Sequence, residues 1–213
     1  MMDLATLREN LHYQGLSLGT VALITSALLA LAAAATGPAI QAAEARDLMA
    51  SLAQVLPGGF DNDLLGDTVT VPGPAGDVTV YRARHGDRLE GVVFKVKGQG
   101  YAGPIVALLG LDPQGQILGV RVLKHVETPG LGDKIEPAKG DWIHRFAGKG
   151  LGDPPPERWG VKKDGGDFDQ FSGATITPRA LVRAIREGLE LFARERERML
   201  GTSVPHAVAA VGG

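Results

Sequence analysis

The sequence predicts an α+β protein, in which a single N-terminal transmembrane helix precedes a domain with an antiparallel sheet and packed helices. Three observations predict this fold. Residues 16–36 form an uninterrupted run without a charged side chain. Short β-rich runs alternate with turns rich in Gly and Pro between residues 68 and 124. A long pattern with helical periodicity begins at Thr177.

The uncharged run is long enough to cross a bilayer. At about 1.5 Å per residue, a helix of this length reaches about 30 Å, which is the thickness of the hydrocarbon core. We place the transmembrane helix at residues 16–38, after a short segment at 1–15. A cleaved signal peptide is the alternative, since small residues at 39–42 offer a cleavage site, but the run exceeds the usual hydrophobic region of about 7 to 15 residues. Arg8 and Arg46 flank the run, so charge does not decide its orientation.

A helical stalk is expected over residues 44–66. Its apolar residues recur at helical spacing at Leu48, Leu52, Val55 and Leu56, and the stop signal is Pro57-Gly58-Gly59. The folded domain is then expected at 67–200, and a flexible tail of small apolar residues at 201–213.

Five β-rich runs predict the sheet. They are residues 68–71, 78–83, 91–97, 104–111 and 116–124. The turns between the first two and the last two runs contain Pro and Gly, which suit the backbone angles of tight turns. Because these connections are short, neighbouring strands should run antiparallel.

The predicted C-terminal helix follows the segment Asp169-Gln170-Phe171-Ser172-Gly173-Ala174-Thr175-Ile176-Thr177. Thr177 suits the N-cap and Pro178 the first helical position. One apolar stripe follows, made by Leu181, Val182, Ile185, Leu189 and Phe192. The hydroxyl groups before it would then lie at a helix N-terminus, which favours phosphate. On these residues alone, an ordinary capped surface helix is the favoured interpretation.

Composition excludes several classes of function. The net charge of the 213 residues is −2, and no basic patch predicts nucleic-acid binding. There is no cysteine for disulfides, thiolate metal sites or iron–sulfur clusters, and the five histidines lack the spacing of metal ligands. The Rossmann glycine fingerprint is also missing, so no NAD site, no metal site and no independent catalytic site are predicted.

Two motifs resemble a known family. The run Ser172-Gly173-Ala174-Thr175-Ile176-Thr177, with Asp169 ahead of it, resembles the flavinylation motif of the FMN-binding domain in the G subunit of the Rnf electron-transport complex. The C subunit of the sodium-pumping NADH:quinone reductase shares that domain. The loop Glu127-Thr128-Pro129-Gly130-Leu131-Gly132-Asp133-Lys134 and the run Gly100-Tyr101-Ala102-Gly103-Pro104 resemble the pattern of the Rnf protein.

The resemblance implies a cofactor site. FMN would be attached covalently to Thr177 through its phosphate. The other residues implied to bind or surround it are Ser172, Gly173, Ala174, Thr175, Asp169, Glu127, Thr128, Gly130, Leu131 and Lys134. Gly130 and Gly132 would let the backbone approach a flat ligand closely, and a plain surface turn is the competing interpretation for both. Lys134 could equally be a solvated surface lysine.

The resemblance also implies a role. The chain would be an electron carrier in a membrane-bound, ion-translocating ferredoxin:NAD oxidoreductase, with the A, B, C, D and E subunits of Rnf as partners and a flavin transferase of the ApbE type for its maturation. It would be a single-pass inner-membrane protein with a short cytoplasmic N-terminus and a periplasmic FMN-binding domain. The alternatives are the C subunit of the quinone reductase and a membrane anchor or assembly subunit without redox function.

Overall fold

The computed structural model describes residues 11–56 and 58–201. The chain divides into two compact units, Met1–Leu48 and Met49–Gly213. Most of the segment expected at 1–15, and all but the first residue of the tail expected at 201–213, lie outside the described residues.

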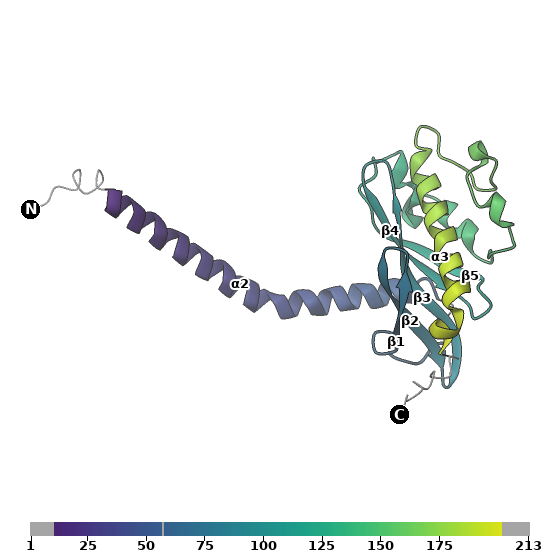
Figure 1. The fold of residues 1–213 in the computed structure, drawn as a ribbon, viewed down its shortest axis with the longest axis horizontal. Helices are drawn as coiled ribbons and strands as arrows, with labels where there is room; N and C mark the ends of the chain where they lie inside the picture. Colours follow the sequence, from purple (N-terminus) through teal and green to yellow (C-terminus); the bar gives the residue numbers. More distant parts are fainter. Residues whose placement is uncertain (1–10, 57, 202–213) are drawn as a thin grey trace, which may run out of the picture. The chain divides into compact units, whose positions relative to one another are not determined.

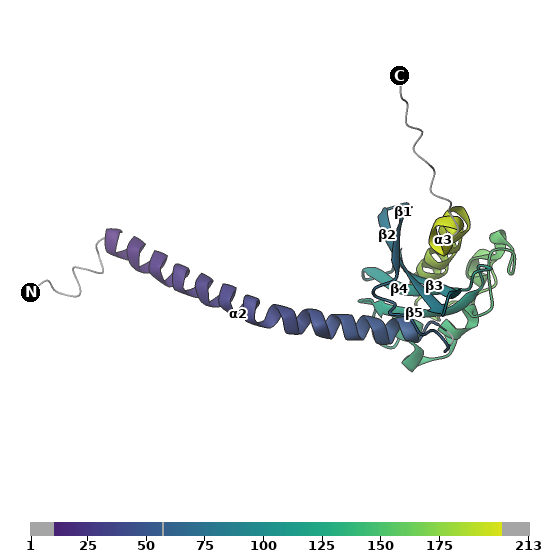
Figure 2. The same cartoon turned by 90° about the horizontal axis from the view of Figure 1, so that it is seen from below.

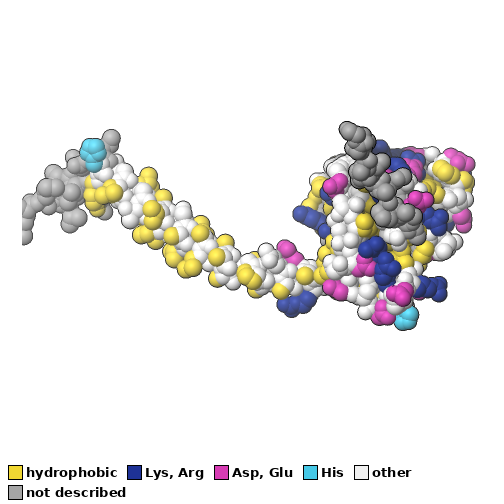
Figure 3. Space-filling view, turned by 60° about the horizontal axis from the view of Figure 1, so that its bottom comes forward, with side chains coloured by type: hydrophobic (Ala, Val, Ile, Leu, Met, Phe, Trp, Pro, Cys, Tyr) yellow, Lys and Arg dark blue, Asp and Glu magenta, His cyan; other side chains and the backbone are white. Residues whose placement is uncertain are grey.

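Helix α2 spans Leu11–Ala53 and contains the whole uncharged run. It is long and apolar enough to cross a membrane, and its apolar side chains are exposed along the run (Figure 3). Pro38 lies inside the helix, where its ring removes a backbone hydrogen bond. The stalk expected at 44–66 is helical only as far as Ala53. The described residues that follow, 54–56 and 58–66, form turns, bends and irregular chain instead.

The sheet has five strands in the order β1-β2-β3-β4-β5, all antiparallel. The strands are β1 (Thr68–Gly73), β2 (Gly76–His85), β3 (Arg88–Gln99), β4 (Pro104–Leu111) and β5 (Ile117–Lys124). Each predicted run therefore contains or overlaps one strand. The predicted turn at 112–115 connects β4 to β5, where Gly115 has a φ of +91°.

Helix α3 (Ile176–Leu200) packs across one face of this sheet (Figures 1 and 2). The predicted apolar stripe faces inward, since Leu181, Ile185 and Leu189 are buried. A Cβ on Gly188 would lie 2.7 Å from Val96, so this glycine allows the helix to approach the sheet closely. The α+β fold expected from the sequence is confirmed.

The opposite face of the sheet is covered by the last turn of α2 and the chain that follows it. Leu52, Val55 and Leu56 are buried. A Cβ on Gly119 of β5 would lie 3.1 Å from Val55 Cα, so this segment lies directly against the sheet. The second half of the expected stalk is therefore part of the folded unit.

The connection from β5 to α3 carries five short 3₁₀ helices, η1 (Gly132–Ile135), η2 (Pro137–Lys139), η3 (Trp142–Phe146), η4 (Pro156–Arg158) and η5 (Lys162–Asp164). Its core is a chain of ring contacts. Trp142 meets Phe171 edge-on with centroids 5.1 Å apart, and Phe146 stacks on Phe168 at 4.7 Å. Because Phe171 directly precedes Ser172, this aromatic cluster fixes the chain just before the motif.

Candidate functional site

The two motifs form one pocket although 50 residues separate Glu127 from Thr177. Its volume is about 510 Å³, within the usual range for small-molecule sites. The lining residues come from the turn after β3, the loop that follows β5 with the start of η1, η5, the turn before α3 and the first residues of α3: Tyr101, Glu127, Thr128, Leu131, Gly132, Lys163, Gly173, Ala174, Thr175, Ile176 and Thr177. The topology brings them together because β3 ends beside the loop that follows β5 and α3 begins at the same edge.

A hydrogen bond joins Thr177 and Glu127, which both line this pocket. The Thr177 hydroxyl donates to Glu127 Oε2, and both residues are buried, at 1% and 5% exposure. A buried threonine hydroxyl bonded to a carboxylate is oriented by that bond and has an acceptor for its proton.

Glu127 is held from several directions. Its Oε2 accepts a hydrogen bond from the Tyr101 amide at 3.1 Å, and its Oε1 accepts one from the Ala102 amide at 3.0 Å. Burial opposes ionisation of Glu127, but hydrogen bonds from Thr177 and from the backbone at 101–103 outweigh it and lower the pKa of the carboxyl. The carboxylate is therefore ionised at neutral pH.

A histidine supports the backbone of Glu127. The Glu127 amide donates to His125 Nδ1 at 3.1 Å, and His125 Nε2 lies 2.7 Å from Glu136 Oε1. Because Nδ1 accepts, the proton of the neutral ring is on Nε2 and points at Glu136. This contact fixes the loop after β5, from which Glu127 projects.

Two glycines leave room for this pair. A Cβ on Gly132 would lie 2.7 Å from Thr177 Oγ1 and 2.8 Å from Glu127 Cβ, and one on Gly100 would fall against the Glu127 carboxylate. The sequence predicted that Gly132 brings the backbone close to a flat ligand. In the structure it brings the loop close to Thr177 itself.

The start of α3 differs from the sequence prediction. The helix begins at Ile176, its N-cap is Thr175, and Thr175 makes no side-chain capping bond. Thr177 is the second helical residue and Pro178 the third, so the predicted capping role of Thr177 is wrong. The physical reason is that the Thr177 hydroxyl bonds to Glu127 rather than to a helix amide.

The motif reaches the helix through a tight turn. The Ala174 amide donates to the Phe171 carbonyl at 3.1 Å, and Gly173 has a φ of +79°, a conformation that favours glycine. Gly173 and Ala174 line the pocket, whereas Ser172 is exposed in the turn and does not.

In the loop after β5, Thr128 and Leu131 line the pocket, but two of the expected residues do not. Gly130 has a φ of +78° in an exposed turn closed by the Thr128 carbonyl. Lys134 is exposed and is not among the lining residues. For Gly130, the turn interpretation therefore describes its position in this structure.

Asp169 lies outside the pocket as well. Its carboxylate pairs with Lys162 Nζ at 2.6 Å and with Arg145. Its carbonyl accepts a hydrogen bond from Trp142 Nε1 at 2.8 Å. The Lys162 hydrogen bond and the charges of both cations outweigh its slight burial and lower the pKa of Asp169. Asp169 therefore anchors the segment before the motif to η3 and η5.

Three pocket residues were not predicted as site residues. Tyr101 and Ile176 line the pocket and yet are 72% and 44% exposed. Lys163 of η5 is the only basic residue among those that line the pocket. Tyr101 lies inside the Gly100–Pro104 run that resembles the Rnf protein, so the sequence could have identified it as a site residue. Lys163 lies in an irregular loop whose sequence has no periodicity or motif.

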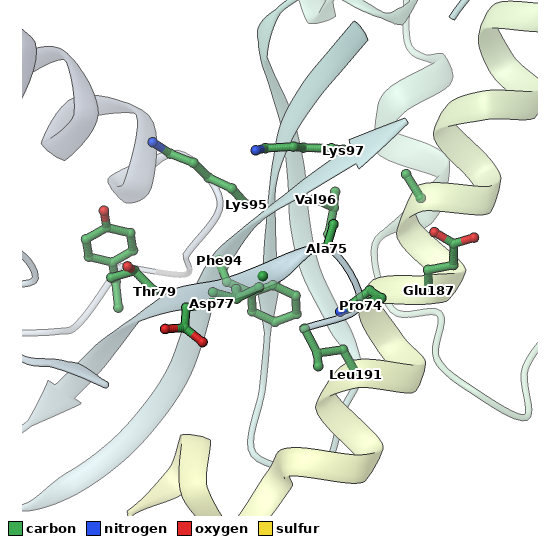
Figure 4. A pocket seen from close by; sticks show the side chains of 15 residues that line it. Pro74, Ala75, Asp77, Thr79, Phe94, Lys95, Val96, Lys97, Glu187 and Leu191 are labelled. Carbon is green, nitrogen blue, oxygen red and sulfur yellow. The ribbon is translucent and has the colours of Figure 1, made fainter. Parts of the chain in front are cut away.

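A second hollow of about 300 Å³ lies between the β1–β2 hairpin, β3 and α3 (Figure 4). Lys95 and Lys97 extend from β3 to one side of it, and Glu187 projects from α3 on the other. Its polar groups do not converge on one point. None of the residues predicted for the cofactor lines it.

Comparisons with known proteins show the family to which the chain belongs. Residues 100–190 match the FMN-binding domain family. The chain is 53% identical over 188 residues to the G subunit of the ion-translocating oxidoreductase complex of Cereibacter sphaeroides, covering 87% of this chain and 86% of that protein. It is 48% identical to the protein of the same name from Stutzerimonas stutzeri, covering 89% and 84%. The crystal structure of Shewanella oneidensis NqrC matches with a TM-score of 0.49 and 26% identity, covering 67% of this chain and 76% of that one. At these identities and coverages to the curated relatives, the chain belongs to the family of G subunits of ion-translocating oxidoreductase complexes.

Proposed function

We propose that this protein is the FMN-carrying electron-transfer subunit of a membrane-bound ion-translocating oxidoreductase complex, with FMN bound covalently to Thr177. The observation that carries the proposal is the Thr177 hydroxyl, which lies in a pocket at the start of α3 within a domain that matches the FMN-binding family. The A to E subunits of Rnf would be its partners in the complex.

The pocket residues fit the parts of FMN. The phosphate would lie at the N-terminus of α3, where free backbone amides and the helix dipole favour an anion. Lys163 would add a positive charge there. Tyr101, Leu131 and Ile176 present exposed apolar surface that the flavin ring would cover. FMN, when bound, supplies the redox chemistry, while this chain holds and orients it.

A covalent bond suits a carrier that must not lose its cofactor. We infer a phosphodiester between Thr177 Oγ1 and the phosphate of FMN, made by a flavin transferase of the ApbE type. Helix α2 would anchor the protein in the inner membrane, with residues 1–15 in the cytoplasm and the flavin domain in the periplasm. Electrons would pass through the domain between other subunits, since the sequence holds no NAD fingerprint and no cysteine.

The test is the intact mass of Thr177→Val after co-expression with the transferase. Wild type should be heavier by one FMN less one water, and the variant should carry no flavin. Valine matches the shape of threonine, so the domain should stay folded at a cost of about 1 to 3 kcal/mol for the Glu127 carboxylate that loses its donor.

The control is Thr175→Val, which removes the neighbouring hydroxyl of the motif and should still be modified. Covalent flavin on Thr177→Val would assign the acceptor to another residue. If wild type carries no flavin beside an active transferase, the protein is a membrane anchor or assembly subunit without a redox role.

A further inference from the structure

We propose that Glu127 is the general base for flavin attachment, so that this chain activates its own threonine. The inference rests on the proposed function, because it concerns how the bond to Thr177 is made. It starts from one contact, the hydrogen bond from the Thr177 hydroxyl to Glu127 Oε2 in the pocket.

A free threonine hydroxyl is a weak nucleophile at neutral pH, and an adjacent base makes it effective. In the reaction, Thr177 Oγ1 forms a bond to the flavin-side phosphorus of a flavin dinucleotide. The bond from that phosphorus to the bridging oxygen breaks, and AMP leaves with the bridging oxygen. The hydroxyl proton passes to Glu127 Oε2. Atoms and charge balance without an oxidant or reductant.

The surroundings of Glu127 suit a general base that is held in a fixed position beside the Thr177 hydroxyl. Two backbone amides, from Tyr101 and Ala102, hold the carboxylate in place, so it need not reorganise to accept the proton. Gly100 and Gly132 leave the space in which the carboxylate and the hydroxyl meet. A carboxylate that served only to hold the loop would not need the nucleophile as its partner.

The product also favours a protonated Glu127. The ester oxygen of Thr177 can no longer donate a hydrogen bond, and the phosphodiester keeps one negative charge beside the carboxylate. Loss of a donor and gain of a neighbouring anion both raise the pKa of a carboxyl group. The carboxyl group can then keep the proton and donate a hydrogen bond to the new phosphodiester. The other titratable groups near it are Lys163 and Tyr101 in the pocket and His125 at its amide.

The experiment measures the rate of flavin attachment to the full-length protein in detergent, with purified transferase, Mg²⁺ and FAD, followed by intact mass. Glu127→Gln keeps the size and a hydrogen-bond acceptor but cannot take the proton at neutral pH. Its rate should fall roughly 100-fold or more, the range of general base catalysis. Glu190→Gln, at an exposed position of α3, is the matched control and should react as wild type does.

Two further measurements separate catalysis from folding. The same transferase acts on wild type and on Glu127→Gln, so the ratio of the two rates does not depend on the titration of the transferase. This ratio should shrink as pH falls through the pKa of Glu127, because a protonated Glu127 can no longer take the proton. In Glu127→Ala, formate should restore part of the rate, whereas formamide, which has a similar shape but no basicity, should not.

The outcomes are distinct from those for the proposed function. If wild type is modified and Glu127→Gln reacts at an equal rate, the base lies on the transferase and this inference is overturned. The inference is also overturned if Glu127→Gln is slow, the ratio of the rates does not change with pH, and formate and formamide have the same effect. The role of Glu127 is then structural. If wild type takes no flavin at all, the proposed function itself fails.

Discussion

At the scale of single residues, the contact between Thr177 and Glu127 decides the local structure. Its acceptor is provided by a residue 50 positions earlier, so no pattern along the helix could reveal it. The sequence did identify Thr177 as the residue of interest, through the resemblance. It assigned the wrong local role, because Ser, Thr and Asn at helix starts usually cap, and here a buried carboxylate competes for the hydroxyl.

The space around this contact leads to a prediction for Gly132→Ala. The added methyl would lie 2.7 Å from Thr177 Oγ1, so the hydroxyl must shift or the loop must move away. Overpacking of this kind costs about 1 to 3 kcal/mol. We expect a lower unfolding temperature together with slower flavin attachment, measured by thermal unfolding and by intact mass.

Gly140→Ala is the matched control for that experiment. It lies in the same β5–α3 connection, no atom lies within 4 Å of the position that its added Cβ would take, and its φ of 160° is extended backbone. Its stability and attachment rate should equal those of wild type. Normal attachment in Gly132→Ala would show that the loop has room to spare beside Thr177.

At the scale of elements, the strands were predictable because Gly and Pro mark their ends. The apolar stripe of α3 was predictable as well, since its period is that of a helix. The end of α2 was not. Leu52, Val55 and Leu56 show helical spacing, yet the chain leaves the helix after Ala53 to cover the sheet, and burial against β4 and β5 decides their conformation.

The loop between β5 and α3 was the least predictable element. Its 3₁₀ helices are too short to show a period, and its conformation depends on contacts between Trp142, Phe146 and Phe168. Lys163 lines the pocket from η5, where the neighbouring Asp164 pairs with Arg179 of α3 at 2.6 Å. Trp142 and Phe146 are both buried.

A charged cluster at the start of the sheet predicts how stability depends on pH. Asp67 accepts a hydrogen bond from Arg84 Nε at 2.7 Å and pairs with Arg82 at 2.5 Å, which ties the residue before β1 to β2. Burial opposes ionisation of Asp67, but the hydrogen bonds and charges of the two arginines outweigh it and lower its pKa. A carboxyl whose pKa is lower in the folded state stabilises the fold above its unfolded pKa, and this contribution is lost as pH falls through the folded value.

Asp67→Asn should therefore be less stable than wild type at pH 7 by about 1 to 3 kcal/mol, and the difference should shrink below about pH 4. Urea unfolding at both pH values measures it. Asp77→Asn, at an exposed position in β2, should match wild type at each pH. A difference between Asp67→Asn and wild type that does not change with pH would mean that the aspartate acts through its shape alone.

At the scale of the whole molecule, α2 and the folded unit have different surfaces. The uncharged run of α2 exposes Leu23, Leu28 and Leu31, whereas charged side chains are spread over the visible face of the folded unit (Figure 3). An apolar helix of this length is stable with its side chains in lipid, because its backbone groups are bonded within the helix. The length of the span was predictable from the sequence, but its direction was not, because Arg8 and Arg46 nearly balance.

The direction can be tested with single cysteines, since the natural chain has none. Glu157→Cys lies at an exposed position in η4, and Glu9→Cys precedes the span. If α2 crosses the inner membrane once with the folded unit in the periplasm, a membrane-impermeant maleimide should label Glu157→Cys in intact cells and Glu9→Cys only after lysis. The wild-type chain should stay unlabelled in both conditions. The reverse pattern would place the folded unit in the cytoplasm, and loss of Glu9→Cys from the mature chain would identify the run as a cleaved signal peptide instead of an anchor.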